Sequence, residues 1–202
     1  MVNWFNVEKA VIAQQHPDRV IPSLAFVHIP VHATLTFQHS KLDPNTSPGI
    51  NEDDVGHQGI TTDPNGKSYY NKLDTPFMQS LAATQGLIAV FSGHDHGDDW
   101  CMKWGDLVGN EPTTGNGINL CFGRHTGYGG YSDWTRGARQ IVVHEDMLNG
   151  KVEVETWIRL ENGKISGYVV LNETFGTDKY PIVEKTTSHL LPESGDVVGV
   201  DD

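Results

Sequence analysis

Cysteine is scarce in this sequence, and long hydrophobic runs are absent. Two cysteines in 202 residues do not make a disulfide-dense secreted scaffold. No stretch reaches the roughly 18 consecutive apolar residues that predict a membrane span. The first residues also lack the basic segment and apolar core of a signal peptide. We therefore expect no membrane partner, and both a cytoplasmic and a secretory location remain open.

Basic residues are few as well. The chain carries 14 lysines and arginines against 26 acidic residues, which gives a formal net charge of -12. Nucleic acids and anionic membranes favour positively charged surfaces, so neither is an expected partner. A phosphorylated small molecule is not excluded, because bound cations would dominate the local field.

The segment Gly93–His96 is the most informative part of the chain. It follows Leu87–Phe91, an apolar run of the length expected for a buried strand. His94 and His96 are two positions apart, so in an extended stretch both imidazoles point the same way. Imidazoles that converge at a strand end are typical metal ligands. An isolated H-x-H is more often a pair of polar loop residues.

His28 repeats this pattern. It follows the apolar run Ser23–Val27 and precedes Pro30, which ends a strand. Ligands in open α/β sheets collect at the carboxyl ends of the strands. If the two strands are neighbours, His28, His94 and His96 form a candidate metal site.

Three segments together resemble a known family. They are F-V-H-I-P from Phe26, V-F-S-G-H-D-H from Val90, and L-C-F-G-R-H-T-G-Y-G-G-Y from Leu120. This order is similar to that of the calcineurin-like metallophosphoesterases, in their fungal purple-acid-phosphatase-related branch. The resemblance runs from about residue 22 to about residue 175. It implies an α/β (α+β) fold, the C-terminal half of a four-layer β-sandwich flanked by helices. Residues 1–176 would be the partial domain and residues 177–202 an acidic tail.

The resemblance also implies metal ligands. The family binds two divalent or mixed-valence ions (Fe, Zn or Mn) through five blocks: Asp-x-His, Gly-Asp, Gly-Asn-His-Asp/Glu, a lone His and Gly-His-x-His. By position, His28 matches the lone His and His94 the first His of the last block, both on the second metal. His96 would bind the first metal.

The glycine-rich loop after residue 122 is expected near this centre. Arg124, His125, Tyr128 and Tyr131 offer hydrogen-bond donors suited to a phosphate, and the first three are assigned to substrate binding. The alternative, given equal weight for each residue, is a structural role in which side chains such as Tyr128 and Tyr131 only pack the loop.

The first three family blocks have no counterpart before His28. Gly105-Asp106 and Gly109-Asn110-Glu111 imitate two of them, but they follow the Gly-His-x-His block, so we treat them as decoys. The bridging aspartate, the asparagine ligand and the histidine that protonates the leaving group are therefore missing, and no catalytic residue is assigned. We expect a truncated form with little activity.

The implied parent activity is hydrolysis of phosphate monoesters, with two cations activating a hydroxide. The substrate would be a phosphorylated small molecule or a phosphoprotein. Two alternatives stay open: a non-enzymatic binding or scaffold remnant, and a mononuclear metal protein using His28, His94 and His96 with a carboxylate. Whether this chain is an enzyme is uncertain.

The remaining pattern predicts the elements. Helices are expected over residues 6–15 and 74–84, the second capped by Asp74 or Thr75. Strands are expected over residues 23–27, 87–91, 118–122, 140–144, 152–160 and 165–172, and loops over residues 39–72, 105–117 and 123–137.

Five further residues have an open role. Cys101 and Cys121 are either buried thiols or a disulfide. His57 is the best further site candidate, ahead of His32 and His39.

Overall fold

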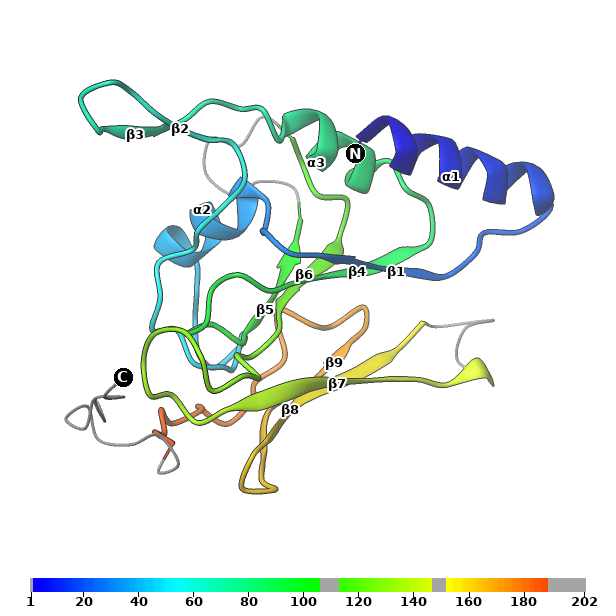
Figure 1. Cartoon of the computed structure of the whole chain (residues 1–202). Helices are drawn as coiled ribbons and strands as arrows, with labels where there is room; N and C mark the ends of the chain where they lie inside the picture. Colours follow the sequence, from blue (N-terminus) through cyan, green and yellow to red (C-terminus); the bar gives the residue numbers. More distant parts are fainter. Residues whose placement is uncertain (1, 106–112, 147–151, 189–202) are drawn as a thin grey trace, which may run out of the picture.

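The computed structural model describes residues 2–105, 113–146 and 152–188. The described residues form three helices and nine strands (Figure 1). The helices are α1 (Val2–Gln15), α2 (His32–Ser40) and α3 (Thr75–Ala82). The strands are β1 (Ser23–Val27), β2 (Ile60–Thr62), β3 (Ser68–Tyr70), β4 (Leu87–Ser92), β5 (Cys101–Trp104), β6 (Ile118–Phe122), β7 (Gly137–Val143), β8 (Val154–Leu160) and β9 (Ile165–Leu171).

A four-stranded sheet organises the chain, in the order β1-β4-β6-β5. β1, β4 and β6 are parallel, and β5 is antiparallel to β6. The apolar runs of β4 and β6 are covered on both faces, as expected for parallel strands. Because Val27 pairs with Ser92, the segments that follow β1 and β4 leave the sheet at the same edge.

A three-stranded antiparallel sheet, β7-β8-β9, lies under the first sheet (Figure 1). Every second residue of β8 is buried, since one face of this sheet packs inward. Side chains of both sheets form the core between them, among them Ala89, Phe91, Val169 and Leu171. The result is a β-sandwich.

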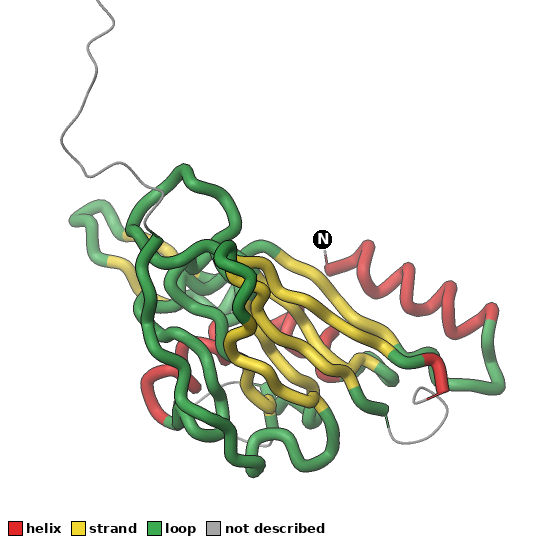
Figure 2. The backbone as a smooth tube through the Cα atoms, turned by 90° about the horizontal axis from the view of Figure 1, so that it is seen from below, coloured by secondary structure: helices red, strands yellow, loops and turns green. Residues whose placement is uncertain are grey.

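The helices cover the other face of the four-stranded sheet. α3 buries Phe77, Met78 and Leu81 there, and α2 buries Ala33. α1 has no fully buried residue. The loops gather at the end of the sheet where β1 and β4 finish, as two views show (Figure 1, Figure 2). The predicted mixed fold of sheets flanked by helices is confirmed.

Most of the predicted elements are present: both helices and all six strands form close to the expected bounds. Three expectations were wrong. The β2–β3 hairpin lies within the expected loop 39–72, and neither α2, which ends at the start of that loop, nor β5 was predicted. β1 is an edge strand in which Phe26 is 67% exposed, rather than a buried strand.

Asp74 does not cap its own helix through its side chain. Its carboxylate instead accepts hydrogen bonds from the backbone N–H of His32 (2.9 Å) and from the hydroxyl of Tyr70 (2.7 Å). It therefore satisfies a donor in the first turn of α2. Helix α2, whose sequence has little apolar periodicity, is thus stabilised by Asp74, which lies 42 residues after His32 in the sequence.

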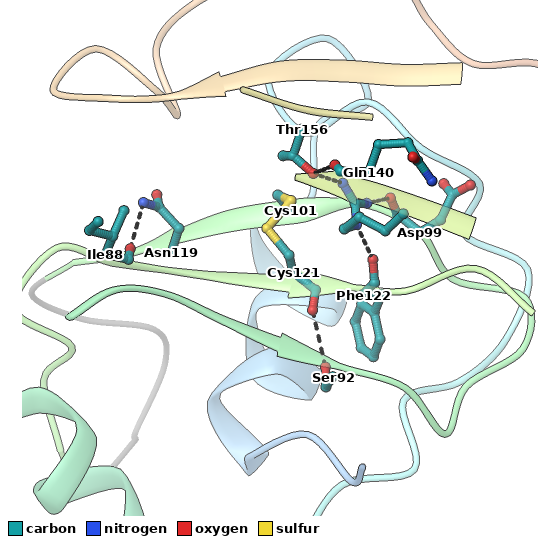
Figure 3. The surroundings of a disulfide bond; sticks show 10 residues. Ile88, Ser92, Asp99, Cys101, Asn119, Cys121, Phe122, Gln140 and Thr156 are labelled. Carbon is teal, nitrogen blue, oxygen red and sulfur yellow. Dashed lines mark hydrogen bonds between the residues drawn. A yellow bond between two sulfur atoms is a disulfide. The ribbon is translucent and has the colours of Figure 1, made fainter. Parts of the chain in front are cut away.

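Cys101 and Cys121 form a disulfide between the paired strands β5 and β6 (Figure 3). Nearby, Arg139 of β7 links the two sheets. Its guanidinium donates to the carbonyl oxygens of Phe122 and Asp99 and to the hydroxyl of Thr156 on β8. The question left open by the sequence is answered in favour of the disulfide.

Residues 179–188 run as an extended segment against the body of the molecule; we call this segment the strap. Its backbone is held by Tyr180 N–H to Asn45 O (2.8 Å), Thr135 N–H to Thr186 O (2.8 Å) and Ser188 N–H to Asp133 O (2.6 Å). The predicted tail 177–202 is thus attached to the body as far as residue 188. Its remainder lies outside the described residues, as do Asp106 and Gly109-Asn110-Glu111. None of the described helices has the length and apolar character needed to cross a bilayer.

Candidate metal-binding edge of the sheet

His28 and His94 meet where β1 and β4 end. The Nε2 atom of His28 lies 3.4 Å from Nδ1 of His94, and the two ring planes are almost perpendicular, at 83°. The backbone N–H of Gly93 donates to the carbonyl of His28 (3.0 Å), which holds the two segments together. Both imidazoles are exposed to solvent. The sequence prediction that these two rings share one edge is confirmed.

His94 has a left-handed backbone, with φ 75°. This conformation is uncommon for a residue with a Cβ atom, and such residues cluster at functional sites. Gly56 lies against its ring: a Cβ atom at residue 56 would be 2.8 Å from His94 Nε2. The position and orientation of His94 are therefore set by its own backbone and by a glycine from a distant loop.

His96 is not part of this pair. Its ring is stacked between His125, at 3.7 Å between centroids, and Tyr131, at 4.4 Å. Burial lowers the pKa of both His96 and His125. Nδ1 of each ring is buried without a hydrogen-bond partner among the described residues. The structure thus does not gather the three predicted ligands into one cluster.

Two buried carboxyl groups adjoin these histidines. Asp95 accepts a hydrogen bond from Gly56 N–H (2.7 Å), and burial raises its pKa to about 6. Asp98 is 0% exposed, and burial, followed by the charge of Asp95, raises its pKa to about 8. Each has one buried oxygen without a partner among the described residues. Asp53 is held by Tyr131, whose hydroxyl donates to its carboxylate.

The three predicted phosphate-binding residues are placed apart from the His28–His94 pair. Arg124 is 5% exposed, and its Nη1 contacts the buried Asp99 at 2.6 Å. The hydroxyl of Tyr128 donates to Glu161 in the β8–β9 turn (2.5 Å). His125 contacts His96, as described above. A substrate-binding role stays a prediction for all three, but the structure gives Arg124 an interior partner.

The three other histidines that were candidates from the sequence, His32, His39 and His57, each contact another side chain in the structure. His57 is buried and lies 4.4 Å from His32 between ring centroids, and His32 stacks on Tyr70 at 3.6 Å. His39 is exposed and contacts Asp54. His57 therefore belongs to a packed aromatic cluster beside Gly56.

The His28–His94 pair fits a single cation. Two imidazole nitrogens bound tetrahedrally to zinc, with Zn–N bonds of about 2.0–2.1 Å, are about 3.3–3.4 Å apart. The observed separation is 3.4 Å. However, in the described part of the chain no group of three or more His, Cys, Asp or Glu side chains is placed to hold a metal ion. The full dinuclear ligand set is therefore not assembled by these residues.

Sequence reasoning missed Asp95, Asp98 and Gly56 as residues of this edge, whereas Tyr131 belongs to the loop that was expected near it. Asp95 lies within the Gly93–His96 segment and Asp98 two residues beyond it, so the acidic run was the available signal. Gly56 carried no local signal, because its role depends on a contact with a residue 38 positions later.

Comparison with known proteins gives two distant similarities. No model of a known protein family matches the chain, and no solved structure is significantly similar. The chain is 28% identical over 176 residues to "Probable inactive purple acid phosphatase 29" of Arabidopsis thaliana, covering 81% of this chain and 38% of that protein. It is 25% identical over 173 residues to "Probable inactive purple acid phosphatase 14" of the same plant, covering 79% and 36%.

The chain thus spans a little over a third of the length of the curated relatives it matches. Both relatives are plant proteins, so the fungal branch stays a prediction. The similarities support a relationship between this chain and the metallophosphoesterases, at the level of purple-acid-phosphatase-like proteins.

Proposed function

We propose that this chain provides a two-histidine metal site, formed by His28 and His94, of a phosphoesterase-related fold. The parent activity would be hydrolysis of phosphate monoesters, and this chain has little of it. The observation that carries the proposal is the 3.4 Å separation of the two ring nitrogens at the ends of adjacent parallel strands.

Low activity follows from the donor set. Two cations in such a site polarise the phosphoryl oxygens and activate the attacking water. Two imidazoles leave at least half of the coordination positions of even one cation to solvent, so its affinity is weak. No residue is assigned to protonate the leaving group. The names of both relatives include "inactive", which supports the same conclusion.

Further donors could reach this edge beside β1. Among the described strands β1 pairs only with β4, so its other edge can pair with a strand from another polypeptide segment. Phe26 stacks on Phe91 at 5.5 Å but is largely uncovered. A carboxylate at the end of an added parallel strand would lie next to His28, because parallel strands end at the same edge.

The alternative of a non-enzymatic remnant is favoured by the same relatives' names and by the missing acid. The alternative of a three-histidine mononuclear site is less well supported. It requires His96 to leave its stack between His125 and Tyr131 and turn toward His28 and His94.

Metal binding tests the proposal directly. Calorimetric titration of the purified chain with Zn²⁺ or Co²⁺ should show one weak site. His28→Ala and His94→Ala should each weaken binding by more than the roughly 10–100-fold lost with an outer-shell partner. His39→Ala, at an exposed histidine, should not. If either of the first two variants binds like the parent, the pair is not the site.

Activity is the second test. The chain should hydrolyse p-nitrophenyl phosphate no faster than buffer containing the same Zn²⁺, Mn²⁺ or Fe, because loss of general acid catalysis alone costs a factor of about 10²–10⁴. Metal-dependent turnover that His96→Ala abolishes together with metal binding would instead support the three-histidine alternative.

A further inference from the structure

Asn172 lies in the turn that follows β9 and begins the sequence Asn172-Glu173-Thr174. An asparagine two residues before a serine or threonine, with any residue but proline between them, is the acceptor sequence for N-linked glycans. A match of three residues is frequent by chance, so the sequence alone does not assign a glycan to Asn172. The chain contains a second match, Asn45-Thr46-Ser47.

The turn after β9 uses the side-chain oxygen of Asn172. Oδ1 accepts hydrogen bonds from the backbone N–H groups of Thr174 (3.0 Å) and Phe175 (3.1 Å), and the hydroxyl of Thr174 also lies 3.0 Å from it. Among the described residues, Nδ2 has one long hydrogen bond, 3.4 Å to Glu153. A side-chain amide has two N–H donors, so one of them is left over. A sugar attached to Nδ2 therefore breaks none of the bonds at Oδ1.

The surroundings of Asn172 combine a fixed backbone with an open surface. The ammonium group of Lys103 donates to the carbonyl oxygens of Asn172 (2.9 Å) and Glu173 (2.7 Å), and Phe175 is 1% exposed in the core between the sheets. Glu173 and Thr174 are exposed. A small cavity of about 120 Å³ lies beside them, lined by Val152, Glu153 and residues 172–174. A glycan on Asn172 thus has space beside the turn.

The match at Asn45 is less favourable. Asn45 is exposed, but Ser47, which supplies the hydroxyl group, is 3% exposed and is followed directly by Pro48. Proline restricts the backbone of the residue before it, so Ser47 has limited freedom to adapt to a transferase even before the chain folds. We therefore expect Asn172 to be the preferred acceptor.

The disulfide is an independent observation that points to the same modification. Cys101 and Cys121 are bonded across β5 and β6, and each is 1% exposed. Structural disulfides form and persist in oxidising compartments, among them the lumen of the endoplasmic reticulum. N-linked glycans are added in that lumen, so the bond and the glycan belong to one compartment.

We propose that Asn172 carries an N-linked glycan. In the transfer, Nδ2 forms a bond to C1 of a lipid-linked oligosaccharide, and the bond between C1 and the diphosphate oxygen breaks. The lipid diphosphate leaves with the bonding electrons, and one Nδ2 proton is released. The remaining N–H still donates to Glu153. Neither His28 nor His94 takes part, so this proposal is independent of the proposed metal site.

The test secretes the full chain from a eukaryotic expression host behind a cleavable leader peptide. Glycans are released in ¹⁸O-labelled water with an amidase that converts the glycan-bearing asparagine to aspartate, and mass spectrometry of peptides then identifies the labelled site. We expect label at residue 172 in most molecules and at residue 45 in few. No label at residue 172, or label mainly at residue 45, would overturn the proposal.

A matched pair of variants separates the acceptor sequence from the stability of the turn. Thr174→Ser keeps a hydroxyl group two residues after Asn172 and should keep the glycan. Thr174→Val has nearly the same volume but no hydroxyl group, and it should lose the glycan although Asn172 is retained. Label is measured on secreted and cell-associated protein together, so a variant that folds poorly is still scored. Label at residue 172 in Thr174→Val, or its loss in Thr174→Ser, would contradict the assignment.

Discussion

His94 holds a left-handed conformation that costs about 1–3 kcal/mol for a residue with a Cβ atom. Its ring lies between His28 and the backbone of Gly56. The cost is compatible with a function, because the unusual backbone aims Nδ1 at His28. At the scale of single residues, the proposed metal-binding edge therefore depends on a glycine that is not itself a proposed ligand.

Replacement of Gly56 by alanine tests this dependence. The added Cβ atom would lie 2.7 Å from Cδ2 and 2.8 Å from Nε2 of His94, so the ring must move. We expect Zn²⁺ affinity to fall by roughly tenfold or more, as for loss of an outer-shell partner. The clash should also lower the free energy of unfolding by about 1–3 kcal/mol. Calorimetry and urea unfolding measure the two effects.

Gly127→Ala is the control, because a Cβ atom there would have no neighbour within 4 Å. It should change the free energy of unfolding by less than about 0.5 kcal/mol. Unchanged Zn²⁺ binding by Gly56→Ala would show that the position of His94 does not matter for the site.

At the scale of elements, polar side chains as well as apolar contacts join the two sheets. Arg139 on β7 reaches the carbonyls of Phe122 and Asp99, beside β6 and β5, and the hydroxyl of Thr156 on β8. Burial lowers its pKa to about 10, which still leaves it charged at neutral pH. Asp99 in turn holds Arg124, so one network joins β7, the start of β5 and the loop after β6.

Arg139→Met keeps the length of the side chain but removes its donors. Buried acceptors left unsatisfied cost about 1–3 kcal/mol each. Because Arg139 has three acceptors, we expect the free energy of unfolding, measured in urea, to fall by about 3 kcal/mol or more. Arg159→Met, which loses only an exposed bond to Gly163 O, should stay within about 0.5 kcal/mol. Similar effects of the two substitutions would mean that the network does not stabilise the sandwich.

The disulfide adds a covalent link between β5 and β6. Cys101 and Cys121 are 20 residues apart, and closing a loop of this length in the unfolded chain corresponds to about 3 kcal/mol. The double variant Cys101→Ala/Cys121→Ala should be less stable by roughly this amount. Addition of reductant should lower the free energy of unfolding of the parent by the same amount. It should not change the free energy of unfolding of the double variant. Two titratable thiols in the unreduced, denatured parent would contradict the disulfide.

At the scale of the whole molecule, two elements expose large apolar residues. β1 leaves Phe26 67% exposed at the edge of the sheet, and α1 exposes Trp4 (63%) together with Val7 and Val11. The spacing of these α1 residues places them on one face of the helix. Exposed apolar residues and a strand edge without a partner among the described strands are typical of interaction sites.

We expect the isolated chain to self-associate through these exposed residues of α1 and β1. The net charge of -12 opposes association by repulsion, so association should increase with salt as charges are screened. Light scattering after size-exclusion chromatography should show oligomers that increase with protein and salt concentration. Trp4→Glu combined with Phe26→Thr should shift the chain toward monomer.

Val143→Thr combined with Ile165→Thr removes exposed apolar side chains from β7 and β9 and serves as the control. It should not change the association. A monodisperse parent monomer at high salt, with cooperative unfolding at high temperature, would show that the exposed apolar residues of α1 and β1 do not drive association.

Local sequence was sufficient for most elements and for the placement of His28 beside His94. The continuous apolar runs of β4 and β6, the alternation in β8 and the turn at Gly163 all report burial or backbone geometry within a few residues. The histidines after β1 and β4 were placed together because parallel neighbours end at the same edge. These inferences need only chain periodicity and the geometry of parallel strands.

The tertiary structure decided the partners of individual side chains. His96 stacks with His125 and Tyr131, Arg124 pairs with Asp99, and α2 is capped by Asp74. Each of these contacts joins residues at least 25 positions apart. Periodicity indicates which face of an element is buried, but a hydrogen-bond or ring partner is selected only when distant segments pack together.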